Sequence, residues 1–199
     1  MKKAGGKKAV EDMIQEVGEE AAEKALKIVG KSTLKWQKHQ VERLAFIIKN
    51  PPPGGDRVIN NIDALMDTKG IQGCVDSLYG GFDHEGGTGW MKTQKGPTAE
   101  LQIAAEEIKP ENIVELRPTL DGKEQADILA KNPHRAIQIK NRNSANKCVD
   151  ELYEQFPTTK SKYPSHRVDA YVPNIYVSEV QTRLSQAFPF EIKIFPIPA

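Results

Sequence analysis

Two short strand-like runs flank a turn in the second half of the chain, and this pattern limits the available folds more than any other. The runs ADILA (126–130) and RAIQIK (135–140) are rich in apolar residues, and the KNPH that separates them favours a turn. A connection this short joins neighbouring antiparallel strands. The sequence therefore predicts an antiparallel hairpin.

The segments around this hairpin alternate between helical and strand patterns. A helix is expected at 99–108 with Thr98 as its N-cap, then a strand at 113–120, and after the hairpin a helix at 144–156 with Ser144 as its N-cap. The remaining elements are a strand, RVDAYVP, a helix, VSEVQTRLSQAF, and a strand, FEIKIFPI. This order predicts an α/β domain with a mixed sheet flanked by helices.

The first half of the chain predicts a small helical region. Apolar residues recur at helical spacing over 10–29, and a second helix, with Ser32 as its cap, ends before the prolines and glycines of 50–55. A short helix is expected at about 58–67, followed by a long glycine-rich loop. The expected organisation is a helical region at 1–50, a linker with a short helix and a Gly-rich loop at 51–96, and the α/β domain at 97–199.

The composition is that of a soluble globular protein, with 38% hydrophobic residues, 28% charged residues and a formal net charge of +1. Any attraction to nucleic acid must therefore come from a local patch of charge. No apolar run is long enough to span a membrane, and no secretory leader is recognisable. Cys74 and Cys148 lack the spacing of a zinc site, and we favour two unlinked thiols in a reducing compartment, with a disulfide between them left open.

Polar side chains interrupt the hairpin on one face. Gln138 and Lys140 share a face of their strand, and Asp127 on the neighbouring strand can meet them if the strands pair as the short turn suggests. A carboxylate, an amide oxygen and the backbone carbonyl of Ile139 are hard ligands suited to Mg²⁺, and Glu100 is placed to add a second carboxylate. The ammonium of Lys140 can orient water or stabilise charge on a phosphate. This is the outline of a phosphodiesterase site.

These residues resemble the PD-(D/E)xK nuclease superfamily, in AELQIAAEEI (99–108) and QADILAKNPHRAIQIKNRN (125–143). In that family a helix glutamate precedes a strand aspartate, and a (D/E)xK or QxK triplet lies on the next strand. Glu100, Asp127, Gln138 and Lys140 match these positions, and the arrangement looks especially like the archaeal Holliday-junction resolvases.

The resemblance implies a restriction-endonuclease-like fold and a Mg²⁺-dependent nuclease in which Mn²⁺ can substitute. The implied metal ligands are Asp127, Glu100, Gln138 and the Ile139 carbonyl, and Lys140 is expected to help activate water. Gln138 departs from the more usual acid, because glutamine keeps an oxygen ligand but removes a negative charge.

The N-terminal segment 5–32 resembles the helical segments that precede C-terminal toxin domains in bacterial polymorphic toxins of the contact-dependent inhibition and Rhs types. This implies a nuclease toxin delivered into a target-cell cytoplasm as part of a larger secreted protein and inhibited by an immunity protein. A repair, recombination or mobile-element nuclease and a non-catalytic nucleic-acid-binding module are the alternatives. DNA or RNA as substrate and the oligomeric state stay open.

Other groups of polar residues in the chain are candidates for rival or additional sites. Basic residues outnumber acidic ones between 140 and 167, which indicates either a solvated face or phosphate contacts, with Arg142 and Lys147 preferred. His134, in the hairpin turn, is either a polar tip or a phosphate contact. A second triplet, Glu191-Ile192-Lys193, is interpreted as a solvent-facing edge strand, and the Asp83-His84-Glu85 cluster as a solvated loop.

Overall fold

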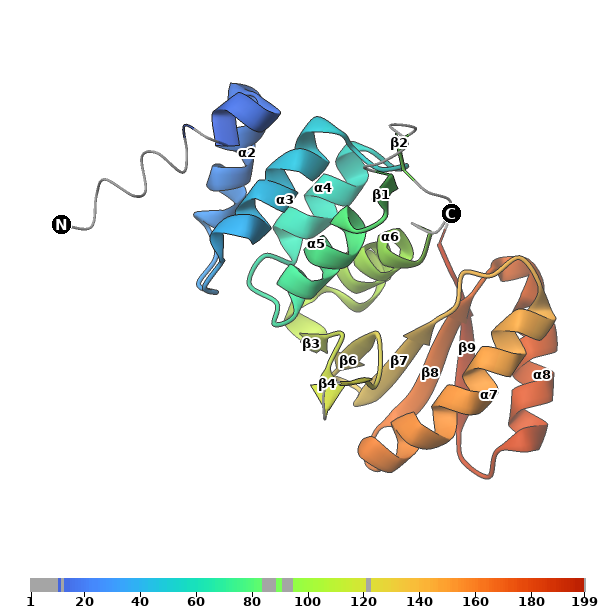
Figure 1. Cartoon of the computed structure of the whole chain (residues 1–199). Coiled ribbons are helices and arrows are strands. Elements are labelled where there is room, and N and C mark those ends of the chain that lie inside the picture. The colour runs from blue at the N-terminus through green and yellow to red at the C-terminus, as the bar shows by residue number, and fades with distance from the viewer. Residues whose placement is uncertain (1–10, 12, 84–88, 91–94, 121–122, 199) are drawn as a thin grey trace. The chain divides into compact units, whose positions relative to one another are not determined.

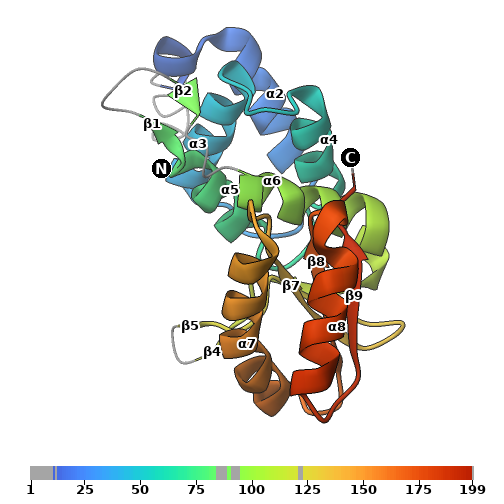
Figure 2. The same cartoon turned by 90° about the vertical axis from the view of Figure 1, so that its right-hand side faces the viewer.

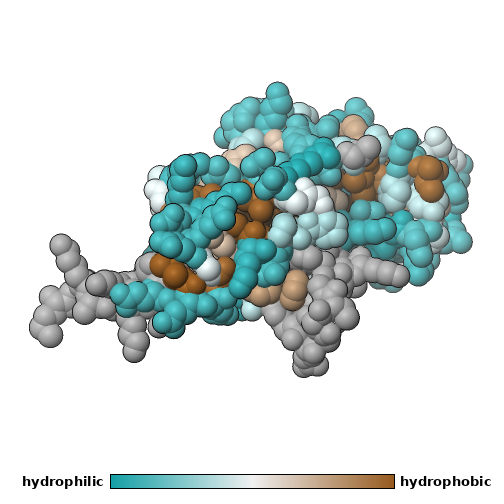
Figure 3. Space-filling model, turned by 90° about the horizontal axis from the view of Figure 1, so that it is seen from above, coloured by the Kyte–Doolittle hydropathy of each residue, from teal (hydrophilic) through white to brown (hydrophobic). Residues whose placement is uncertain are grey.

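The structure of the chain is a computed structural model, and it describes residues 11, 13–83, 89–90, 95–120 and 123–198. The chain divides into two compact units, Met1–Gln94 and Lys95–Ala199 (Figure 1). Among the described residues, no helix combines the length and apolar character needed to cross a membrane. The face drawn in Figure 3 is mainly hydrophilic, with hydrophobic residues showing in small areas.

The first unit is helical. Apolar side chains of four helices form its core, including Ile28, Leu44, Ile62 and Leu78. A pair of two-residue antiparallel strands follows the helices. The elements are α2 (Glu19–Val29), α3 (Lys38–Lys49), α4 (Asp56–Ala64), α5 (Ile71–Tyr79), β1 (Phe82–Asp83) and β2 (Gly89–Trp90).

The first unit differs from its prediction in two ways. Ser32 does not cap a helix, because its hydroxyl donates to the Met66 carbonyl, and α3 begins only at Lys38 after a capping box between Gln37 and Gln40. Between residues 51 and 96, where one short helix was expected, the structure has α4 and α5. The sequence pattern did not predict α5, whose buried face consists of Ile71, Cys74, Val75 and Leu78. His84 and Glu85 lie outside the described residues.

The second unit is built on a five-stranded mixed sheet with the order β3-β6-β7-β8-β9. The pairs β3–β6 and β6–β7 are antiparallel, and β7–β8 and β8–β9 are parallel. A small hairpin, β4–β5, projects between β3 and β6. The elements are α6 (Lys95–Gln102), the π-helical η2 (Ile103–Ile108), η3 (Pro110–Asn112), β3 (Ile113–Leu116), β4 (Thr119–Leu120), β5 (Lys123–Glu124), β6 (Ile128–Ala130), β7 (Arg135–Ile139), α7 (Ala145–Lys162), β8 (Arg167–Val172), η4 (Asn174–Tyr176), α8 (Val177–Ala187) and β9 (Ile192–Pro196).

Helices cover the sheet on both sides. In Figures 1 and 2, α7 and α8 lie side by side on one face, and α6 lies on the other side of the sheet. The core against α7 and α8 is formed by alternate residues of the parallel strands, because side chains two apart on a strand share a face. It includes Leu152 and Phe156 of α7, Val168, Ala170 and Val172 of β8, and Val180, Leu184, Ile192 and Ile194.

The predicted mixed sheet flanked by helices is confirmed, with the main elements in the predicted order. Ser144 caps α7 as predicted, since its hydroxyl accepts the Lys147 backbone N–H at 3.3 Å. Thr98 is not a cap, because α6 begins at Lys95 and Pro97 is tolerated in the first turn. The expected end of α7 at residue 156 was also wrong. The helix continues through Pro157 to Lys162.

Both cysteines are buried thiols, and neither forms a disulfide. Cys74 lies in α5 of the first unit, and Cys148 lies in α7 of the second. The thiol of Cys148 packs in the core and donates weakly to the Lys140 carbonyl at 3.5 Å. Burial raises the pKa of the Cys148 thiol, which favours its neutral form. The favoured prediction of two unlinked thiols is confirmed.

Candidate active site

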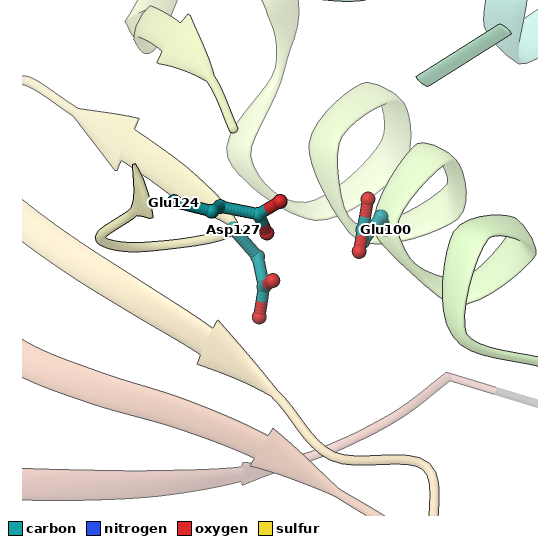
Figure 4. Close-up of side chains that lie close together, drawn as sticks. All are labelled: Glu100, Glu124 and Asp127. Carbon is teal, nitrogen blue, oxygen red and sulfur yellow. The ribbon is translucent and has the colours of Figure 1, made fainter. Parts of the chain in front are cut away.

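Three carboxylates meet at the open end of the central hairpin. Each of Glu100, Glu124 and Asp127 offers an oxygen within 4.8 Å of the others. Figure 4 shows the three side chains directed toward one another from α6, β5 and the residue that precedes β6. A group of acidic oxygens this close is the kind of arrangement that holds a divalent cation.

The register of the hairpin places Asp127 in this cluster. Ile128 pairs with Ile137, so Asp127 lies one position further along and opposite Gln138. The backbone N–H of Asp127 donates to the Ile137 carbonyl at 2.9 Å, and its side-chain Oδ2 accepts the backbone N–H of Ile139. The carboxylate is therefore fixed at the end of the strand pair rather than left free to rotate.

Lys140 and Gln138 complete the group predicted from the hairpin. Lys140 is only 7% exposed, its Nζ lies 3.8 Å from Oδ2 of Asp127, and it donates to Oε1 of Gln138 at 3.3 Å. The backbone N–H of Lys140 donates to the Tyr171 carbonyl at 2.9 Å, which continues the pairing with β8. The structure thus brings Asp127, Gln138 and Lys140 together with Glu100.

The backbone carbonyl of Ile139 belongs to the same side of the strand. Backbone N–H and C=O groups of one strand residue point the same way, and they alternate from one residue to the next. Because Ile139 donates its N–H to Asp127 and Lys140 donates to β8, the Ile139 carbonyl is directed toward the β6 side, where the carboxylates lie. This agrees with its expected part in the oxygen set.

Burial and mutual repulsion make the two inner carboxylates reluctant to ionise. Burial first, and then the charge of Asp127, raises the pKa of Glu100 to about 8. Burial also raises the pKa of Asp127 to about 6, although Lys140 opposes this shift. The Oε2 atom of Glu100 is buried and accepts no hydrogen bond from the residues that the structure describes, while Arg117 Nε is 3.9 Å away. A proton or a bound cation would reduce the repulsion between these two carboxylates.

A cavity of about 700 Å³ lies beside these groups, between the hairpin and the C-terminal half of α7. It is lined by polar side chains for the most part, and its volume is in the range of small-molecule and cofactor sites. The lining residues are Lys123, Glu124, Gln125, Ala126, Asp127, Gln138, Lys140, Glu154, Gln155, Thr158 and Thr159. Asp127 and Lys140 are therefore accessible to a ligand from this cavity although their side chains are mostly buried.

Glu124 and Arg117 are parts of the site that the sequence did not reveal. Arg117 contacts Glu124 through Nη2 at 2.8 Å and Nε at 3.0 Å. Arg117 has a left-handed backbone (φ 49°), which a residue with a side chain adopts only under local constraint. The sequence pattern predicted a single strand at 113–120 and therefore did not place these two residues at the site. In the structure β3 and β4 are separate strands, and β5, paired with β4, brings Glu124 to the cluster.

The three predicted phosphate contacts are not gathered at this site. Arg142 forms a two-point ion pair with Glu151 at 2.7 and 2.9 Å. Lys147 is exposed near this pair, in a hollow that also includes Asp150 and Glu151. His134 lies at the other end of β7, in ring contact with His166. A strand rises about 3.3 Å per residue, so His134 is roughly 20 Å from Lys140.

The rival triplet is a surface feature. Lys193 is exposed on β9, the last strand of the sheet, Glu191 is exposed just before this strand, and their charged atoms lie 3.5 Å apart. Asp169, the nearest aspartate on a strand, is fully buried and accepts two hydrogen bonds from Arg167, at 2.6 and 2.8 Å. The prediction of a solvent-facing edge strand is confirmed, and Asp169 already has a cationic partner.

Comparisons of the chain with known proteins found no match. The chain matches no model of a protein family, and neither a curated protein nor a solved structure shows a significant match to it.

Proposed function

We propose that the second unit is a Mg²⁺-dependent nuclease with a restriction-endonuclease-like fold. The observation that carries the proposal is the meeting of two buried carboxylates, Glu100 and Asp127, with Lys140 and Gln138 beside a polar cavity. The order of helices and strands agrees with that fold, and the matched residues come together in space although they are spread along 40 residues of sequence.

The donor set fits a hard divalent cation. Asp127, Glu100, the amide oxygen of Gln138 and the Ile139 carbonyl would hold the ion, with Glu124 at the more exposed edge. The buried Oε2 of Glu100, which accepts no hydrogen bond within the described part of the chain, is suited to a ligand that supplies positive charge. When bound, Mg²⁺ supplies Lewis-acid stabilisation of the charge that develops on a phosphate.

The protein groups have distinct parts in phosphodiester hydrolysis. The ammonium of Lys140, held between Asp127 and Gln138, is placed to orient an attacking water and to stabilise negative charge at phosphorus. Asp127 holds Lys140 by charge, and its own orientation is fixed by the Ile139 N–H. We assign no base or sugar contact, because this set of residues acts on the phosphate that DNA and RNA share.

We further propose that the enzyme is an interbacterial toxin, on the strength of the N-terminal segment that resembles those of polymorphic toxins. In this proposal the nuclease acts in the cytoplasm of a target cell and is inhibited by a cognate immunity protein. Expression of the chain in a bacterial cytoplasm should inhibit growth, and co-expression of the gene found downstream should relieve the inhibition if the proposal is correct. Equal growth with and without that partner would contradict the toxin role but not the nuclease.

The nuclease is tested by incubating the purified chain with plasmid DNA and with total RNA, in Mg²⁺, Mn²⁺ or EDTA. We expect cleavage of at least one substrate with metal and none with EDTA. Asp127→Asn keeps the shape and the contact with Ile139 but removes the charge, and Lys140→Met removes the ammonium. Each is expected to reduce the rate by about 100-fold or more.

The second Glu-Ile-Lys triplet provides matched controls within the same chain. Glu191→Gln and Lys193→Met make the same kinds of change in two exposed side chains and should leave cleavage unchanged. Circular dichroism and thermal unfolding establish that all four variants are folded. Cleavage at the rate of the unaltered chain in Asp127→Asn or Lys140→Met would rule out this site.

A further inference from the structure

The side-chain amide of Gln138 is held by two buried acceptors. Its Nε2 donates to the Gln125 carbonyl at 3.1 Å and to Oγ1 of Thr159 at 3.1 Å. The Thr159 hydroxyl in turn donates to the same Gln125 carbonyl at 2.9 Å. Gln138, Thr159 and Gln125 are all buried, and Thr159 is only 1% exposed. The amide nitrogen is therefore the end of the side chain that faces these two acceptors.

These contacts fix which end of the amide faces the site. Its Oε1 is directed to Lys140, which donates to it at 3.3 Å and lies 3.8 Å from Asp127. If the amide turned over, its N–H groups would face the Lys140 ammonium and its oxygen would face the Gln125 carbonyl. In that orientation a donor would face a donor at Lys140 and an acceptor would face an acceptor at Gln125. Because both places are buried, several hydrogen bonds would be lost.

The same contacts distinguish glutamine from glutamate at this position. A carboxylate in place of the amide would set a negative oxygen against the Gln125 carbonyl, at the place where Nε2 now lies 3.1 Å from it. The surroundings are thus complementary to an amide. A site that had merely lost its acid would retain free donors at this position. Here the described partners of Nε2 are the Gln125 carbonyl, which can only accept, and the Thr159 hydroxyl, whose proton is already donated to that carbonyl.

We propose that Thr159 and the Gln125 carbonyl form a clamp that selects glutamine at position 138 and presents its Oε1 to the divalent cation. Thr159 is a positioning residue, since it acts through Gln138 and does not itself face the cation. The clamp links the C-terminal half of α7 to the metal ligands on the hairpin. This inference rests on the proposed function of the site, and it makes glutamine a dedicated neutral ligand there.

The clamp is tested through the affinity for Mn²⁺ alone, measured by electron paramagnetic resonance without substrate. Thr159→Val keeps the shape but removes the hydroxyl, and should weaken Mn²⁺ binding by about tenfold, as is usual when a group supporting a ligand is lost. Thr159→Ser restores the hydroxyl and should restore the affinity. In a Gln138→Ala background, Thr159→Val should have no further effect. Thr182→Val, on the exposed face of α8, is the control.

Two further measurements examine the clamp without relying on that variant. By nuclear magnetic resonance, the side-chain amide protons of Gln138 should exchange with solvent much more slowly than those of the exposed Gln186. Gln138→Glu should bring no gain in Mn²⁺ affinity. Rapid exchange at Gln138, or a higher affinity in Gln138→Glu than in the unaltered chain, would overturn the clamp.

The outcomes separate this inference from the nuclease itself. If the chain cleaves nucleic acid and Thr159→Val binds Mn²⁺ as tightly as the unaltered chain, the clamp is wrong and the nuclease stands. If no substrate is cleaved with any metal, the nuclease is wrong, and the Mn²⁺ titration and the amide exchange still decide the clamp. If the unaltered chain binds no Mn²⁺, the clamp is overturned as well.

Discussion

Glu100 and Asp127 are buried carboxylates whose ionised forms are costly to keep in the second unit. Both are buried, both have raised pKa values, and neither is fully neutralised by the cations nearby, Arg117 at 3.9 Å and Lys140 at 3.8 Å. Carboxylates placed in this way destabilise a fold unless they carry a proton or bind a cation. Such an arrangement is typical of functional sites.

The metal-free protein should therefore lose stability as the pH rises. Folded Glu100 binds its proton more tightly than unfolded Glu100, because burial raises its pKa from 4.5 to about 8. This contribution to the free energy of unfolding is fully present below pH 4.5 and is lost as the pH rises through about 8. Urea unfolding in EDTA at pH 5, 6.5 and 8 measures it.

Glu100→Gln isolates the effect of this one carboxyl group. The variant cannot ionise, so its stability relative to the unaltered chain should increase between pH 5 and pH 8. Glu111→Gln, which changes an exposed glutamate of η3, serves as the control and should follow the unaltered chain. A constant difference between Glu100→Gln and the unaltered chain at all three values would contradict the raised pKa.

At the scale of elements, the hairpin was predictable and the extent of α7 was not. The turn and the alternating residues fix β6 and β7, and the register then brings Asp127 to Gln138 and Lys140. The helix was expected to end at residue 156, but it continues through Pro157, although proline removes a helical hydrogen bond. Burial of Phe156 and Thr159 on either side of it shows why the helix continues, and packing of this kind is not readable from local sequence.

As a result, the sequence pattern did not predict that α7 contributes residues to the cavity. Glu154 and Gln155 line the cavity within the expected helix, and Thr158 and Thr159 line it from the part of α7 that lies beyond the expected end at residue 156. Glu124 was missed for a similar reason, because a two-residue strand has too little pattern to predict. The residues with a local motif were found, and those brought in by tertiary packing were not.

The start of α7 offers a test of an element that the sequence did define. Ser144 accepts the Lys147 N–H at 3.3 Å, so Ser144→Ala should lower the free energy of unfolding by about 1 kcal/mol. Ser144→Asp keeps an acceptor and should retain most of the stability. Ser161→Ala, in the last turn of the same helix, is the control, and urea unfolding is the measurement. An equal effect at positions 144 and 161 would contradict the cap.

At the scale of the whole molecule, the site belongs to one unit. Every residue assigned to the metal, the cavity or the clamp lies in Lys95–Ala199, together with the five-stranded sheet. The unit has its own hydrophobic core between the sheet and α7 and α8, including Leu152, Phe156 and Val180. A chain of about 100 residues with such a core is within the usual size of a domain that folds alone.

We therefore expect residues 95–199, produced as a fragment, to fold and to bind Mn²⁺ with the affinity of the full chain. The physical reason is that both the core and the oxygen ligands are complete within this unit. A single cooperative transition in urea and an unchanged Mn²⁺ titration are the measurements. A fragment carrying Asp127→Asn is the matched control, since it keeps the core and loses a ligand. A folded fragment that binds Mn²⁺ no better than this control would mean that the first unit contributes to the site, whereas an unfolded one would mean that it contributes to the fold.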